Sequence, residues 1–89
     1  MLLLLNSSAI SVLTDKEFFM GDIKYLSEIN ELVNVPLLRK DFTIDPYQIY
    51  EARLYGADIV LLIAAILEKE TIKEYLGIVD QLNMDAIVE

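Results

Sequence analysis

The stretch LLRKDFT, residues 37–43, joins a short apolar run to a group of charged and aromatic residues. The apolar part is typical of a buried strand, and the polar part follows at the strand's C-terminal end. In open parallel sheets and in closed barrels, the loops after the strands form the rim that faces ligands. Lys40 is therefore a candidate for contact with a substrate.

Three more apolar runs accompany this one along the chain. They cover residues 9–13, 59–63 and 86–88, and the run that leads to Lys40 begins near residue 35. All are rich in Val, Ile and Leu and are nearly continuous, which is typical of strands that are buried on both faces of a parallel sheet. The sequence therefore predicts four parallel strands.

Helical patterns separate the four predicted strands. The first pattern places apolar residues on one stripe, at Ile23, Leu26, Ile29, Leu32 and Val33. The third pattern does the same at Ile72, Tyr75, Leu76, Val79 and Leu82. Apolar residues at this spacing indicate amphipathic helices that cover a sheet.

The second predicted helix, from about Pro46 to Tyr55, has the clearest boundaries. Asp45 can cap its start, Pro46 suits its first position, and Gln48 lies where a capping box needs a second polar side chain. Gly56 suits the turn that ends the helix.

The strands begin about 25 residues apart, which is the length of one strand-loop-helix-loop unit. The predicted fold class is α/β, with a parallel βαβαβαβ sheet and right-handed crossovers. Both a doubly wound sheet and a βα barrel obey these local rules. Four strands cannot close a barrel of this type by themselves, because closure takes eight.

Composition limits the classes of function. The chain has 89 residues, of which 55% are hydrophobic and 25% charged, so it is long enough for one small packed domain or for part of a larger one. Its formal net charge is −8. An acidic balance of this size argues against nucleic acids and anionic membrane surfaces as partners.

The chain contains neither cysteine nor histidine. Disulfides and thiolate catalysis are therefore excluded, and the commonest ligand of a zinc site is missing. The leucines near the start lack the basic flank of a signal peptide, and no apolar run approaches the roughly 20 residues of a membrane span. We therefore expect a soluble, cytoplasmic protein without a metal site.

Five motifs then occur in the order and at the spacing of one enzyme family. They are AISVLTD at 9–15, FFMG at 18–21, LRKDF at 38–42, YQIYEAR at 47–53 and GADIVLLI at 56–63. As a set they resemble indole-3-glycerol phosphate synthase. The resemblance covers the second to fifth strands of that family's eight-stranded TIM (βα)8 barrel. It implies a half-barrel fragment at residues 8–89, preceded by a non-family N-terminal junction at residues 1–7.

The resemblance also implies a reaction and a set of site residues. The family is a lyase of tryptophan biosynthesis that closes an indole ring on a carboxyphenylamino-deoxyribulose phosphate, with loss of carbon dioxide and water and without a cofactor. On the matching positions, Lys40 acts as a general acid and Glu89 as a partner in proton transfer. Phe19 and Phe42 line the apolar part of the pocket that holds the aromatic ring.

Several functional groups of the family have no counterpart in this chain. The glutamate and lysine of its first strand, the catalytic groups of its sixth and seventh strands and the phosphate site after its last strands are all absent. Such groups act as a unit, so we expect the chain to be inactive alone and to bind the phosphate substrate weakly if at all. Open sheet edges would favour self-association as a homodimer or a larger assembly.

Two other classes of protein fit parts of the sequence. A flavodoxin-like receiver would use a strand-end acid such as Asp41, although residues 13–15 supply only one carboxylate where a magnesium site needs an acidic pair. A strand-end aspartate can equally cap a turn or pair with a neighbour such as Arg39. The second alternative is an assembly module without a ligand.

Overall fold

The structure, a computed structural model, describes residues 2–6, 9–14 and 22–89. Its sheet contains the strands β1 (Leu2–Asn6), β2 (Ala9–Leu13), β3 (Leu37–Lys40), β4 (Ile59–Leu62) and β5 (Asp85–Val88), in this spatial order. The strands β2 to β5 are parallel to one another. The predicted parallel sheet is therefore confirmed, with its strands within about two residues of the predicted positions.

The leucine run near the start of the chain adds a fifth strand that was not part of the predicted sheet. This strand, β1, pairs with β2 in the antiparallel direction, with Leu2 opposite Val12 and Asn6 opposite Ala9. An antiparallel partner can be reached through a short connection, whereas a parallel one needs a crossover of a dozen residues or more. The proposed boundary of the barrel domain at residue 8 stays a prediction.

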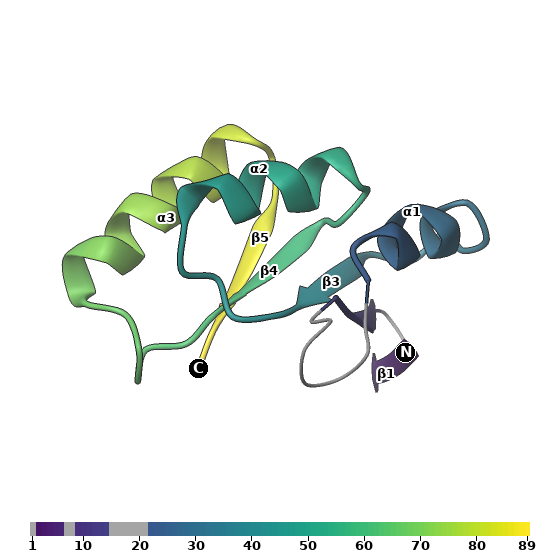
Figure 1. Cartoon of the computed structure of the whole chain (residues 1–89), viewed down its shortest axis with the longest axis horizontal. Helices are drawn as coiled ribbons and strands as arrows, with labels where there is room; N and C mark the ends of the chain where they lie inside the picture. The colour runs from purple at the N-terminus through teal and green to yellow at the C-terminus, as the bar shows by residue number, and fades with distance from the viewer. Residues whose placement is uncertain (1, 7–8, 15–21) are drawn as a thin grey trace.

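Three helices, α1 (Lys24–Asn30), α2 (Pro46–Leu54) and α3 (Lys69–Gln81), connect the parallel strands. They lie side by side on the same face of the sheet (Figure 1). A flavodoxin-like sheet has the strand order 2-1-3-4-5, with helices on both faces. The sequential order and the single helical layer are instead those of part of a βα barrel, and the receiver alternative is wrong.

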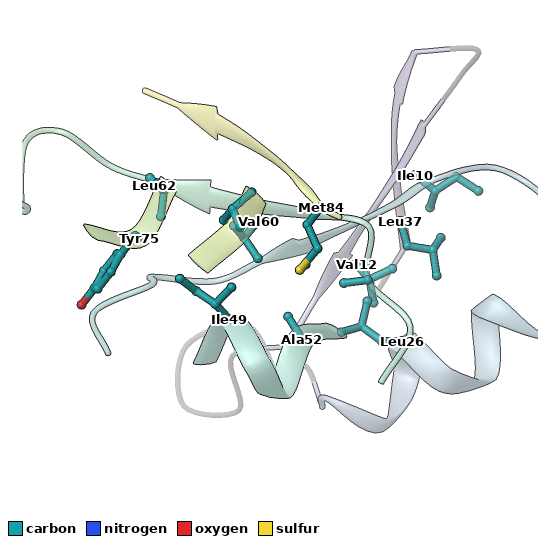
Figure 2. Close-up of a cluster of buried hydrophobic side chains, with 12 residues drawn as sticks. Ile10, Val12, Leu26, Leu37, Ile49, Ala52, Val60, Leu62, Tyr75 and Met84 are labelled. Carbon is teal, nitrogen blue, oxygen red and sulfur yellow. The ribbon is translucent and has the colours of Figure 1, made fainter. Parts of the chain in front are cut away.

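The hydrophobic core fills the space between the sheet and the three helices. Figure 2 shows side chains from the strands facing side chains from the helices across this space. The largest side chains that are fully buried there are Leu26, Leu37, Ile49, Leu62, Val12 and Val60. Burial of a leucine or valine of this kind contributes about 1.5–3 kcal/mol, so the core stabilises both the helices and their positions on the sheet.

The ends of α2 follow from its sequence. Asp45 accepts a hydrogen bond from the Tyr47 N–H, while the Gln48 side chain accepts from the Asp45 N–H, which completes the predicted capping box. At the other end, Gly56 has a φ of 103° and its N–H donates to Arg53. The positive φ favours glycine, and a Cβ at this position would also lie 3.0 Å from the Asn30 side chain, which would have to shift.

Two of the predicted apolar stripes extend further than the buried faces of the helices. Helix α1 ends at Asn30, and Leu32 beyond it is 80% exposed. In α3, Tyr75 and Val79 are buried while Leu76 is 40% exposed. In the described part of the chain, no helix has the length and hydropathy that crossing a membrane requires.

Tyr75 is the titratable side chain most affected by the core. Its ring packs beside the sheet and its hydroxyl points away from the cluster (Figure 2). Burial, with smaller contributions from the charges of Asp45 and Glu74, raises the pKa of this hydroxyl above its ordinary value of 10.0.

This shift predicts a loss of stability at alkaline pH. Below pH 10.0 the stability due to neutral Tyr75 is complete, and it declines as the pH rises through the raised pKa, because the unfolded chain releases its proton first. Urea unfolding of wild type and Tyr75→Phe above pH 10.0 should therefore give the steeper decline in wild type. Tyr47→Phe, at a ring that is 67% exposed, should behave like wild type. Parallel declines in wild type and Tyr75→Phe would contradict the prediction.

Candidate functional site

Side chains alternate along β3 between the helical layer and the opposite face of the sheet. Leu37 belongs to the core under the helices, and Arg39 bonds to main-chain and side-chain atoms of α2. Lys40 lies on the other side, where it borders a pocket with residues of β2 and β4. The period of two along a strand therefore separates the two cations of the LRKDF motif.

The pocket lies at the C-terminal ends of the parallel strands and has a volume of about 180 Å³. Its lining is formed by Leu13, Lys40, Asp41, Phe42, Leu61, Ile63 and Glu89. Three of the four residues predicted for the site, Lys40, Phe42 and Glu89, thus border one cavity. The fourth, Phe19, lies outside the described residues.

The two candidate catalytic residues reach the pocket from strands at different places in the sheet. Glu89 directly follows β5, and its N–H donates to the Leu62 carbonyl at 2.9 Å. Its main-chain oxygen accepts from the Ala64 N–H at 2.6 Å. Lys40 forms no ion pair within the described part of the chain. An anionic group in the pocket would therefore meet an ammonium without competition from a bound carboxylate.

Phe42 presents an aromatic ring at the same rim, and hydrogen bonds hold its main chain on both sides. Its N–H donates to Asp41 Oδ1 at 2.8 Å, and its carbonyl accepts from Gln48 Nε2 at 2.8 Å. Phe42 as a whole remains 45% exposed. A partly open ring on a fixed main chain can stack against a flat apolar ligand without first becoming ordered.

A buried network of polar groups lies behind this rim. The side chain of Arg39 is only 8% exposed, and its Nε donates to Thr14 Oγ1 at 3.0 Å. Its NH1 group donates to the Gln48 carbonyl at 3.0 Å and pairs with Glu51 at 2.9 Å. The Thr14 hydroxyl in turn donates to Asp41 Oδ2 at 2.8 Å. The buried charge therefore has acceptors at its Nε and NH1 groups and faces Asp41 with its NH2 group at 3.6 Å.

Only part of this network is predictable from the sequence. Pairing with Arg39 is among the roles that the sequence predicts for Asp41, and the two side chains lie 3.6 Å apart. Thr14 and the burial of Arg39 were missed. The available signal was the alternation along the strand, which places Arg39 on the same face as Leu37.

A second polar cluster occupies the opposite end of the sheet. Asp58 accepts from the Leu37 N–H at 3.2 Å and pairs with Arg53 at 3.1 Å. Beside it lies a wider, more polar hollow of about 400 Å³, lined by Asn30, Val33, Asn34, Val35, Pro36 and Asp58. In α/β barrels this N-terminal face serves stability, while active sites use the other face.

Comparison with known proteins identifies the chain's family. The family model for indole-3-glycerol phosphate synthase matches residues 4–89. The chain belongs to this family. It is 58% identical over 84 residues to an indole-3-glycerol phosphate synthase of Ruminiclostridium cellulolyticum, which covers 94% of this chain. It is 54% identical over 81 residues to that of Desulfotalea psychrophila and 58% over 83 residues to that of Trichodesmium erythraeum, with 91% and 93% of the chain covered.

The matches cover only part of each indole-3-glycerol phosphate synthase. The aligned residues make up 32%, 31% and 28% of those three relatives. The chain therefore spans about a third of the length of the curated relatives that it matches. In the described residues, no group of three or more histidine, cysteine, aspartate or glutamate side chains is arranged to hold a metal ion.

The buried network predicts unequal effects of two arginine substitutions. Arg39→Met should lower the free energy of unfolding by about 3 kcal/mol, because it leaves the enclosed carboxylates of Asp41 and Glu51 without their cation. Arg53→Met should cost about 1 kcal/mol or less, since the Arg53 side chain is 36% exposed. Urea unfolding near neutral pH measures both values. Equal losses would show that the Arg39 network adds nothing beyond a surface pair.

Proposed function

We propose that this chain forms the part of an indole-3-glycerol phosphate synthase active site that supplies Lys40, Phe42 and Glu89. The observation that carries the proposal is the shared pocket at the C-terminal ends of the strands, which all three residues border. In βα barrels, active sites occur on this face. The pocket offers a cation, a carboxylate and an aromatic wall, which suit an aromatic substrate that carries negative charge.

These groups suit a ring closure with loss of carbon dioxide and water. In the proposed reaction, a carbon-carbon bond forms at the ring carbon that bears the carboxylate, the carboxylate leaves as carbon dioxide, and the former carbonyl oxygen leaves as water. Lys40 donates a proton to that oxygen as negative charge develops on it. Glu89 transfers a proton during ring closure and dehydration. Phe42, together with Phe19, holds the aromatic ring.

We propose that the 89 residues alone do not complete this reaction. The relatives are about three times as long, and the family's phosphate site belongs to strands that lie outside the matched region. Catalytic groups that act together lose most of their effect when several are removed. The proposed location is the cytoplasm and the proposed chemistry uses no cofactor, since proton transfer by side chains is sufficient.

A binding experiment tests the assignment of the pocket. The probe is 2-aminobenzoate, whose carboxylate is opposite in charge to Lys40 and whose aromatic ring can stack on Phe42. In an NMR titration, Lys40→Ala should weaken binding roughly tenfold, the value of one charge-assisted hydrogen bond. Lys69→Ala, at an exposed lysine that begins α3, should leave the affinity within about twofold.

The same samples are assayed for turnover of the carboxyphenylamino-deoxyribulose phosphate. We expect no indole product from the chain alone. Product formation would overturn the proposed inactivity, while equal binding by wild type and Lys40→Ala would overturn the role of Lys40.

We further propose that the chain associates with itself through the β5 edge. Strand β5 is last in the sheet order, and no other described strand pairs with its outer side. Its side chains Ile87 and Val88 are 36% and 49% exposed. An open strand edge with exposed apolar side chains is a common template for pairing between chains.

Light scattering of the chain at increasing concentration tests this proposal. The expected mass is at least twice that of one chain, and added salt should favour association by screening the net charge of −8. Ile87→Arg should shift the mass toward the monomer, while Leu54→Arg on the outer side of α2, 82% exposed, should not. A monomer at high concentration would contradict the proposal.

A further inference from the structure

We propose that Thr14, acting with Arg39, is a positioning residue of the pocket. Its hydroxyl fixes the Asp41 carboxylate that holds the main chain at Phe42, and it thereby sets where the Phe42 ring stands beside Lys40. The inference rests on the proposed function of the pocket and adds to it a residue that does not line the cavity.

The Thr14 hydroxyl lies between Arg39 and Asp41 and bonds to both. It accepts from Arg39 Nε at 3.0 Å and donates to Asp41 Oδ2 at 2.8 Å, so the hydroxyl serves both as acceptor and as donor. Thr14 is 5% exposed, and little water is available to replace these bonds. A hydroxyl held in this way has a single orientation, because its lone pair and its proton have different partners.

The two carboxylate oxygens of Asp41 have different partners. The Oδ2 atom receives the Thr14 hydroxyl and faces Arg39 at 3.6 Å. The Oδ1 atom accepts from the Phe42 N–H at 2.8 Å. Since the carboxylate is planar and rigid, fixing one oxygen also fixes the direction of the other. The orientation of Asp41 is therefore transmitted to the main chain of Phe42.

Hydrogen bonds with Gln48 of α2 hold the loop from its other side. Gln48 Nε2 donates to the Phe42 carbonyl, and the Gln48 carbonyl accepts from Arg39 at 3.0 Å. Residues of the β2 end, the β3 end and α2 thus meet around one guanidinium. Removal of the Thr14 hydroxyl opens this arrangement at the point nearest to Asp41, without a change in net charge.

The experiment compares Thr14→Val with Thr43→Val by NMR on the full chain. Both threonines are buried, at 5% and 4% exposed, and both variants exchange a hydroxyl for a methyl group. The first readout is the backbone order parameter of Phe42. We expect about 0.85 in wild type and Thr43→Val and below about 0.6 in Thr14→Val. An unchanged value in Thr14→Val overturns the inference.

The second readout is the affinity for 2-aminobenzoate. Thr14→Val should weaken binding about fivefold or more and Thr43→Val less than about twofold, the discrimination expected of a positioned group. Equal weakening by both variants overturns the inference. If wild type does not bind the probe, the proposed function of the pocket fails, and the order parameter alone decides whether Thr14 positions Phe42.

A third variant keeps the test decisive if Thr14→Val does not fold. Asp41→Ala removes the acceptor of the Phe42 N–H directly. A low order parameter at Phe42 in this variant supports the inference, and a value equal to that of wild type overturns it.

Discussion

The buried Arg39 guanidinium is the group around which three separate parts of the chain are arranged. It bonds to Thr14 after β2 and to the Gln48 carbonyl and Glu51 of α2, and it faces Asp41 after β3. A charge removed from water is tolerated only when acceptors surround it, so these partners must lie close together in the native state. The ends of β2 and β3 also border the pocket, and the shape of its rim therefore depends on how this charge is satisfied.

The two faces of the sheet have different roles. On the helical side, a continuous apolar core fixes the strands and the helices relative to one another. On the other side, Leu13 of β2 and Leu61 of β4 line the pocket together with the groups that suit a substrate. Because successive residues of a strand point to opposite faces, the LRKDF motif contributes to both: its arginine ties the strand to α2, and its lysine faces the ligand.

The sequence predicted most reliably what local chemistry determines. The limits of α2 follow from a capping box and a glycine, and the parallel strands from their continuous apolar runs. Three predicted site residues also reached one pocket, because the ends of parallel strands meet at one edge of a sheet. The sequence was a poor guide where tertiary structure determines the end of a helix or the partner of a strand. Leu32 fits the stripe of α1 but lies beyond its end, and the partner of β1 depends on which edge was free. Periodicity gives no information about either.

The turn at Gly56 limits which substitutions this position tolerates during evolution. The residue needs a left-handed backbone, with a φ of 103°, and it also lies against Asn30 of α1. A smaller neighbour at position 30 would relieve the crowding but not the backbone penalty, so a side chain at position 56 stays unfavourable whatever residue stands at position 30. Selection for a stable fold is therefore expected to favour glycine at position 56, independently of selection on the residues of the pocket.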